Sequence, residues 1–600
     1  MGDTELRIPS SDAARSRGLA FSPTLVAVGA VVLVMAVALP QLLARVRDSN
    51  FHELAASIQD DSFYYLLPAF HFKSKLFFTF DGITPSYGFQ PMYELVLAGL
   101  ALFFSDFESF FRGAMTMGLV LHVLTSVLIT CVVLRAVDAR ASWLQWVQRG
   151  AAVVAGLFYF TRGTVLLNSM TLKENALTSF VLAGVLLIAT AQASSAAERR
   201  RLSMWVGLSL SALLLCRMLP TTLVVLGVVG LMALWRWRRP GVLFVSFVLP
   251  LVLWFGYATL AFGHPLPMSA RVKALGSHSA PITWDVISNQ GWAYLKAVFT
   301  FAVGLPSKMF VPQVDAGLLV TNSRQGSLWL ALTVVALAAL VAAAVMAAVQ
   351  ARRSRESSPG PGTLTVMLLA ALTAGILAAY VAQGSLIATR RPGEDSYYIW
   401  YLFDLPVLLS VSLGLAVARG LSTMENARQA RREQSSWKAP SVLVATLGGV
   451  LVASALAVFI ARVPREYRKL SALQPYATFN EDSQAWQHTM IRAGLWLKQN
   501  VQLQPGERVA CFSCGALGML FPGAVLNLDG LANDEAGRFT LDRTTPIARY
   551  VEQVRPRYYI DVHTWHFDDS KVEMRPLHIL PFPYQWKPGY VIAELVYREP

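Results

Sequence analysis

The chain has 600 residues, of which 54% are hydrophobic and only 15% are charged. A water-soluble globular protein needs a larger polar surface, so this composition excludes a soluble class and predicts that most of the chain lies in lipid. In a soluble protein, the net charge of +14 would indicate nucleic acid. Here the basic residues form short clusters between apolar runs, which the positive-inside rule explains without a nucleic-acid partner.

The first apolar run extends from about residue 21 to residue 44. A helix that crosses a bilayer needs about 20 residues, whereas the apolar core of a signal peptide has about 7–15, so we expect a retained helix. Residues 1–20 then form a cytoplasmic N-terminal segment. Ten further runs follow, at residues 112–135, 150–168, 175–193, 202–217, 220–235, 241–262, 326–350, 363–388, 397–418 and 440–462.

Basic clusters fall in alternating connections between these runs, for example at residues 199–201 and 236–239. If these connections face the cytoplasm, about eleven spans occupy residues 21–462, and the C-terminus lies on the outer side. The parity requires that Pro91–Phe104, an apolar run of about 14 residues, lies in the outer interface and does not cross the bilayer. Large external loops are then expected at residues 46–111 and 263–325.

The tail from residue 463 to residue 600 differs in character from the rest of the chain. A helical stretch at residues 481–500 is followed by strand-like segments at 508–512 and 524–528, with a Gly turn between them. A further helix and a strand near residues 558–562 come next. Alternating strands and helices predict a small α/β domain outside the cytoplasm. The expected fold is therefore an α-helical polytopic membrane protein with a small extracytoplasmic α/β domain.

Two adjacent acidic residues, Asp60 and Asp61, lie in the first external loop, within the sequence IQDDSFYYLLP. Two like charges this close are stable only with a nearby cation or hydrogen bonds. A carboxylate here could act as a general base on an acceptor hydroxyl or help to hold a divalent ion. The plainer alternative is that the pair caps a helix or is solvated in a wet loop.

Charged residues also gather at other predicted outer ends of spans. An ionisable residue at such depth indicates function, although snorkelling towards the interface is the alternative. Basic residues outside the cytoplasm oppose the positive-inside bias, and Arg side chains suit phosphate, so this group predicts an anionic ligand. The residues are Lys173 and Glu174 in the second external turn, Arg217, Lys273, Arg390 and Arg391.

The external segment Phe78–Leu95, FTFDGITPSYGFQPMYEL, is rich in Gly, Pro and aromatic residues. Such a loop can form a rigid cleft with flat faces for sugar rings, although aromatic residues are also common at membrane interfaces. The candidate substrate-binding residues of the external regions are Tyr64, Tyr87, Gln90 and Tyr397.

The tail contains three further motifs with open interpretations. Cys511 and Cys514 form a single CxxC, which could be a local disulfide, a weak metal motif or two small buried residues. Asp529, followed by Gly530, could bind an acceptor or end a strand in a turn. The segment His563–Asp569 contains two His and two Asp residues that could hold a metal ion.

Taken in order, these motifs resemble the GT-C class of integral membrane glycosyltransferases, which use polyprenyl-phosphate-linked sugars. The class includes protein mannosyltransferases, the lipid A aminoarabinose transferase and mycobacterial arabinofuranosyltransferases. FDGITPSYGFQPMYELVL resembles the FDG-x-x-PTNGYHPLW segment of a group of bacterial GT-C-like proteins. PMSARVK is similar to that group's PVSG-x-VK, and VLNLDGLAND is similar to NLDGLVN in its C-terminal domain. The likeness covers most of the chain.

The resemblance implies a role for each matching residue. Asp60 is expected to be the general base, Asp61 its partner, and Glu174 the acidic residue of the second external loop. A divalent cation, Mg or Mn, could bind Asp60, Asp61 and Glu174. The chain departs from the family's pattern at Lys173, which could bind phosphate or neutralise Glu174, and at Tyr87 and Gln90, which replace the family's Asn and His.

The resemblance also predicts an inverting glycosyltransferase of the bacterial inner membrane. Its donor would be a polyprenyl-phosphate sugar whose tail stays in the membrane lipid, and its acceptor a cell-envelope glycan, lipid or protein. A ligase or polymerase that takes a whole lipid-linked glycan fits the same residues. The competing classes are a transporter and a non-catalytic assembly protein. Coupled transporters usually have buried ionisable residues or an inverted repeat, whereas the predicted spans here show few buried charges and no inverted repeat.

Overall fold

The computed structural model describes four parts of the chain. These are residues 23–275 (without 57, 136–141 and 162), 367–380 (without 370 and 377), 404–418 (without 405, 416 and 417) and 485–598 (without 513, 542–546, 562–570 and 581–589). The predicted spans at 326–350 and 440–462 lie outside these residues.

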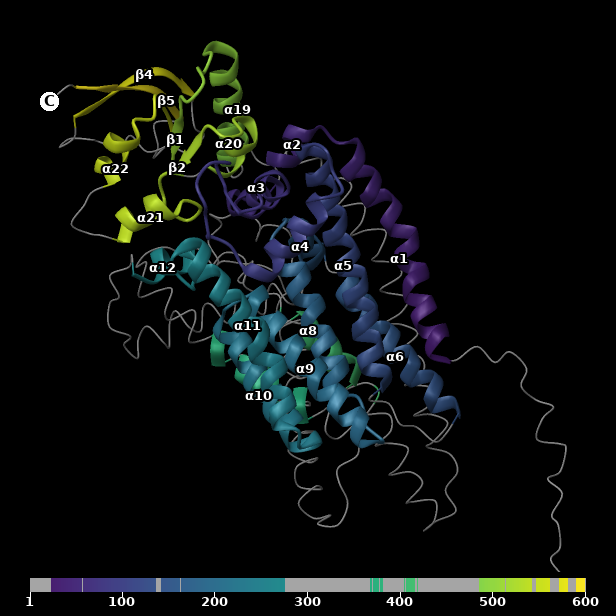
Figure 1. Ribbon diagram of the computed structural model, residues 1–600. Coiled ribbons are helices and arrows are strands. Elements are labelled where there is room, and N and C mark those ends of the chain that lie inside the picture. The colour runs from purple at the N-terminus through teal and green to yellow at the C-terminus, as the bar shows by residue number, and fades with distance from the viewer. Residues whose placement is uncertain are drawn as a thin grey trace, which may run out of the picture.

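The first part is a helical bundle in which long helices run side by side and shorter helices gather at one end (Figure 1). Proline at the first position begins α4, α10 and α11, where its missing N–H costs no hydrogen bond. The helices are α1 (Pro23–Asp48), α2 (Phe51–Ala56), α3 (Asp60–Lys75), α4 (Pro91–Ala101), α5 (Phe107–Arg135), α6 (Ser142–Phe160), α7 (Gly163–Met170), α8 (Asn175–Ala189), α9 (Ala196–Cys216), α10 (Pro220–Trp237), α11 (Pro240–Phe262) and α12 (Met268–Leu275).

Two of the described helices, α5 and α11, are long and apolar enough to cross a membrane. The helices α1, α8, α9 and α10 overlap other predicted spans. One expectation differs from the structure, because the apolar run at 150–168 is divided between α6 and α7. The run Pro91–Phe104, expected to lie in the interface, contains the short helix α4. The number of spans stays a prediction.

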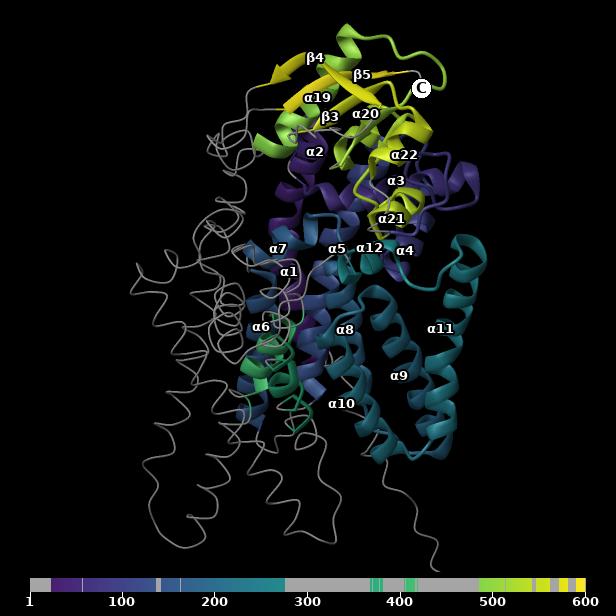
Figure 2. The ribbon, with the colours of Figure 1, turned by 90° about the vertical axis from the view of Figure 1, so that its left-hand side faces the viewer.

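The last part of the chain is a separate layer at the end of the bundle (Figure 2). It contains a five-stranded sheet of order β2-β1-β3-β5-β4, in which β1 is parallel to β2 and β3, whereas β5 is antiparallel to β3 and β4. Its elements are α19 (Ala485–Asn500), β1 (Val509–Cys511), α20 (Gly515–Leu520), β2 (Val525–Asn527), α21 (Asp534–Leu541), α22 (Ile547–Val554), β3 (Tyr558–Asp561), β4 (Val572–Leu580) and β5 (Tyr590–Tyr597). We call this layer the C-terminal domain.

The segment CGALG, expected to be a Gly turn between two strands, instead begins helix α20. This helix packs on α3, and both its glycines permit the close approach. A Cβ on Gly515 would lie 2.4 Å from Asp60 Oδ1, and one on Gly518 would lie 2.4 Å from a methyl carbon of Leu67. Glycine is needed where a side chain would collide with a neighbouring element.

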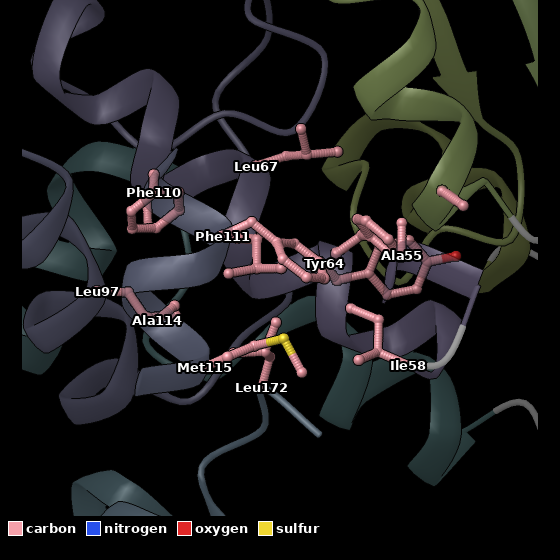
Figure 3. Close-up of a cluster of buried hydrophobic side chains, with 14 of the residues drawn as sticks. Ala55, Ile58, Tyr64, Leu67, Leu97, Phe110, Phe111, Ala114, Met115 and Leu172 are labelled. Atoms are coloured by element: carbon pink, nitrogen blue, oxygen red, sulfur yellow. The ribbon is translucent and has the colours of Figure 1, made fainter. Parts of the chain in front are cut away.

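A continuous apolar core joins the C-terminal domain to the bundle. Buried side chains of α3, α5, α19 and α20 belong to one cluster, so the two parts pack directly against each other. Figure 3 shows Tyr64 among the apolar side chains of this cluster, together with Phe111 and Leu67. Burial of this apolar surface holds the N-terminus of α3 at the junction between bundle and C-terminal domain.

Candidate active site at the N-terminus of helix α3

The acidic pair begins α3, where the positive end of the helix dipole favours carboxylates. Side chains four positions apart lie on the same face of a helix, so Asp60 shares a face with Tyr64, and Asp61 shares a face with Tyr65. The two faces meet different parts of the protein: Tyr64 contacts the C-terminal domain, whereas Asp61 contacts Lys173 in the turn between α7 and α8. The site therefore has two sides, separated by the start of α3.

Lys173 lies opposite Asp61 on the bundle side of the site. Its Nζ is 3.2 Å from Asp61 Oδ2; the lysine side chain is 3% exposed and the aspartate side chain 38%. The hydroxyl of Ser62 donates to the Thr171 carbonyl at 2.6 Å, which fastens the same turn to α3. The like-charge cost of two adjacent aspartates is thus relieved by a buried cation on Asp61.

Arg217 holds the acidic residue of the second turn. Its Nη1 lies 3.0 Å from Glu174 Oε1, with both side chains at most 5% exposed, and donates to Asn175 Oδ1 at 2.6 Å. Asn175 in turn donates to Asn168 Oδ1 at 2.8 Å, and Tyr65 hydrogen bonds to Glu174. This buried network fixes the turn that carries Lys173.

Asp404 lies close enough to Arg217 for their charges to interact, and it is fully buried beside Thr221 and Tyr380. Sequence reasoning missed this residue, although it lies in the predicted span 397–418, where an ionisable side chain is itself a signal of function. Arg217 therefore pairs with Glu174 and also lies within electrostatic range of Asp404, which comes from a distant part of the chain.

The C-terminal side of the site is built around Tyr64. Its hydroxyl lies 3.0 Å from Asp60 Oδ2 and 3.1 Å from Asp529 Oδ2, and it accepts a hydrogen bond from Asn527 Nδ2 at 3.2 Å. Asp529 follows β2 in a tight turn, in which its Oδ1 accepts from the Leu531 N–H at 2.7 Å and Gly530 has a φ of 74°. A strand end and a glycine turn thus place this carboxyl against α3.

Both carboxyls of this group have perturbed acidity. Burial, reinforced by the charge of Asp61, raises the pKa of Asp60 to about 7, although hydrogen bonds from Tyr64 and from the backbone N–H groups of Gly515 and Ala516 oppose the rise. Burial likewise raises the pKa of Asp529 to about 7, with the charge of Asp60 adding to the effect. A carboxyl with a pKa near neutrality is suited to general base catalysis.

The aromatic loop packs against the C-terminal domain. Tyr87 is fully buried; its hydroxyl accepts from Trp254 Nε1 at 2.8 Å, and its N–H donates to Asp534 Oδ1 at 3.0 Å. His264 Nε2 lies 2.9 Å from the other oxygen of Asp534. In this arrangement Tyr87 fastens the loop to α21 and presents no open face to a sugar, so its expected role in substrate binding is not supported by its surroundings.

Gln90 precedes α4, and its Oε1 is buried without a hydrogen-bond partner among the described residues. Tyr64 is also buried. Its hydroxyl contacts the carboxyls of Asp60 and Asp529, and its ring does not present an open face to a sugar. Lys273 lies in α12, with its side chain outside the described part of the structure. Arg390, Arg391 and Tyr397 lie outside the described residues, so their predicted roles stay predictions.

The three carboxyls expected to bind a divalent cation do not form a suitable ligand set. Asp61 and Glu174 are each held by a cationic side chain, and Asp60 faces Tyr64 on the other side of the helix. Within the described ranges, no three His, Cys, Asp or Glu side chains are grouped to hold a metal ion. The segment His563–Asp569 lies outside the described residues. Cys511 and Cys514 form a disulfide directly before α20.

The sequence and the structure were compared with those of known proteins. A model of a domain of unknown function (DUF8728) matches residues 465–596, and no curated protein matches the chain. The structure is similar to that of ArnT from Cupriavidus metallidurans bound to undecaprenyl phosphate, with 13% identity, coverage of 94% of this chain and 98% of ArnT, and a TM-score of 0.50. It is also similar to the apo oligosaccharyltransferase of Archaeoglobus fulgidus, with 13% identity, coverage of 90% and 69%, and a TM-score of 0.47.

The chain therefore has the fold of the polytopic GT-C membrane proteins, of which ArnT is one. The resemblance drawn from the sequence is confirmed at the level of the fold. At 13% identity, the likeness defines the architecture and leaves the reaction to be argued from the site.

Proposed function

We propose that the protein is a membrane glycosyltransferase that moves a sugar from a polyprenyl-phosphate donor to an acceptor hydroxyl on the outer side of the bacterial inner membrane. The observation that carries the proposal is the start of α3, where Asp60, whose carboxyl has a raised pKa, adjoins Asp61, which is paired with the buried cation Lys173. That ArnT was solved with undecaprenyl phosphate supports a lipid phosphate as the carrier. The acceptor would be a cell-envelope glycan, lipid or protein.

The two sides of the site suit the two substrates. A donor held by its lipid tail would reach the bundle side, where Lys173 and Arg217 lie, and an acceptor would approach from the side of the C-terminal domain. The acceptor oxygen attacks the anomeric carbon and its proton passes to the Asp60 carboxylate. The bond from that carbon to the phosphate oxygen breaks, and the phosphate leaves with the electron pair. In-line attack inverts the anomeric centre.

Stabilisation of the leaving phosphate needs positive charge beyond that of the described pairs. Lys173 and Arg217 are already balanced by Asp61 and Glu174, so the four groups together carry no net charge. Lys273, Arg390 and Arg391, which the sequence predicts at the same outer face, would supply the excess that the departing dianion requires. Lys173 would turn from Asp61 to the phosphate as the donor binds.

The experiment that tests the function is donor turnover by the purified protein in nanodiscs. Radiolabelled polyprenyl-phosphate sugars and lipid-linked oligosaccharides are offered, and the release of polyprenyl phosphate is measured. We expect the wild type to turn over at least one donor and Lys173→Met to lower the turnover rate at least tenfold. Asp48→Asn, which changes an exposed carboxylate at the end of α1, is the control and should leave the turnover rate unchanged. Folded protein that neither binds nor turns over any donor would contradict the proposal and favour a transporter or an assembly protein.

A further inference from the structure

The hydroxyl of Tyr64 lies between two carboxyl groups but has only one proton to donate. It lies within hydrogen-bond distance of one oxygen of Asp60 and one of Asp529, at 3.0 and 3.1 Å. A tyrosine hydroxyl has a single proton and can donate to only one of the two. The other contact is a hydrogen bond only if that carboxyl is itself protonated and donates to the tyrosine oxygen.

The tyrosine oxygen can accept that bond. It has two lone pairs, one of which receives the hydrogen bond from Asn527 Nδ2 at 3.2 Å. One proton shared between Asp60 and Asp529, together with the tyrosine proton, therefore satisfies all three contacts. Two ionised carboxylates at these partly buried, adjacent positions would repel each other and leave one contact without a proton.

We propose that Asp529 of the C-terminal domain is a positioning residue that sets the protonation of the base Asp60 through Tyr64, so that the base is complete only when this domain is docked on α3. The inference rests on the proposed function, in which Asp60 takes the acceptor's proton. The inference gives the C-terminal domain a specific role. The sugar-transfer reaction alone does not require that role.

Among the described residues, charged and polar groups approach the pair from three sides. On α3, Asp61 adjoins Asp60 and is neutralised by Lys173. The start of α20 presents the backbone N–H groups of Gly515 and Ala516. On the sheet side, Tyr590 of β5 lies close enough to Asp561 and Asp60 for their charges to act on its hydroxyl. Asp529 is the carboxyl that shares the Tyr64 hydroxyl with Asp60.

The sign of each change follows from these contacts. The charge of Asp60 raises the pKa of Asp529, and repulsion between two carboxylates acts on both of them, so we expect Asp529→Asn to lower the pKa of Asp60. Tyr64→Phe removes a hydrogen bond that stabilises the Asp60 carboxylate, so the same pKa rises. The base must be ionised to act, and its activity therefore rises with pH through the pKa of Asp60. The acidic limb of kcat/KM should move to lower pH in Asp529→Asn and to higher pH in Tyr64→Phe.

Two measurements test the inference. The pH profile of kcat/KM should shift by on the order of one pH unit in opposite directions in the two variants, and Asp529→Glu should return the limb towards that of the wild type. Asp48→Asn serves as a control and should leave the profile unchanged. A limb that stays in place in both Asp529→Asn and Tyr64→Phe would overturn the inference.

The second measurement does not need turnover. Infrared difference spectra recorded during a pH titration should show a protonated carboxyl band that titrates near neutrality, and subtraction of the Asp60→Asn or the Asp529→Asn spectrum should reveal the same band. A band that Asp529→Asn leaves unaltered would contradict the shared proton. If the wild type turns over no donor but the band behaves as expected, the proposed function fails while the shared proton stands.

Discussion

The buried ion pair between Arg217 and Glu174 allows a quantitative prediction. Arg217→Met keeps most of the side-chain volume but leaves Glu174 without its cation and Asn175 without the donor at 2.6 Å. Breaking a buried pair by removing one partner costs about 3–5 kcal/mol, because the remaining charge is uncompensated. The nearby carboxyl of Asp404 also loses a favourable electrostatic neighbour, which adds to the expected cost.

The assay is thermal unfolding of the purified variants in nanodiscs, with Arg201→Met as the matched control. Arg201 is an exposed arginine of the same helix, α9, and its loss should change stability by no more than about 0.5 kcal/mol. The double change Arg217→Met with Glu174→Gln should recover part of the loss, because no buried carboxylate is left at position 174. Equal melting temperatures for Arg217→Met and Arg201→Met would refute the reasoning.

Two further predictions concern the junction with the C-terminal domain. In Gly88→Ala the new methyl would lie 1.7 Å from the Leu531 carbonyl oxygen, so we expect a loss of about 1–3 kcal/mol and faster proteolysis between bundle and domain. The control is Gly99→Ala inside helix α4, where a Cβ meets no atom within 4 Å; this change should not reduce stability, since Ala favours a helix more than Gly does. Equal proteolysis of the two variants would argue against the docking. Replacing Cys511 and Cys514 by Ser should cost about 2 kcal/mol for so short a loop, measured as a lower melting temperature that reductant also produces in the wild type.

Local patterns allowed the sequence to predict several elements of the fold. Apolar length predicted helices at the positions of α5 and α11, and short β-rich segments predicted β1, β2 and β3. The antiparallel pair of β4 and β5 was not predicted, because β4 contains Pro576 and the two charged residues Glu573 and Arg575. These are tolerated in an edge strand, which β4 is.

The partners of the candidate site residues were harder to predict than the residues themselves. Lys173 was expected either to bind phosphate or to neutralise its neighbour Glu174, but the structure pairs it with Asp61. Arg217, more than forty residues away in the chain, pairs with Glu174 instead. Adjacent side chains at the start of a helix point in different directions, so their partners depend on packing that one sequence does not reveal.

The contact between Tyr64 and Asp529 joins residues 465 positions apart. The sequence indicated each as a candidate, one as an aromatic contact for a sugar and the other as an acceptor ligand or a turn residue. Only the docking of α20 and the β2 turn on α3 brings them together. Their shared hydroxyl is a consequence of tertiary packing, and no local motif encodes it.

The most direct test of the account compares the wild type with Asp60→Asn and Asp61→Asn in one donor-turnover assay, at matched folding judged by melting temperature. We expect the wild type to release polyprenyl phosphate, Asp60→Asn to abolish this release, and Asp61→Asn to weaken it by disturbing Lys173. Turnover that survives in Asp60→Asn and vanishes in Asp61→Asn would contradict the assignment of the base and move the reacting carboxylate to the bundle side of α3.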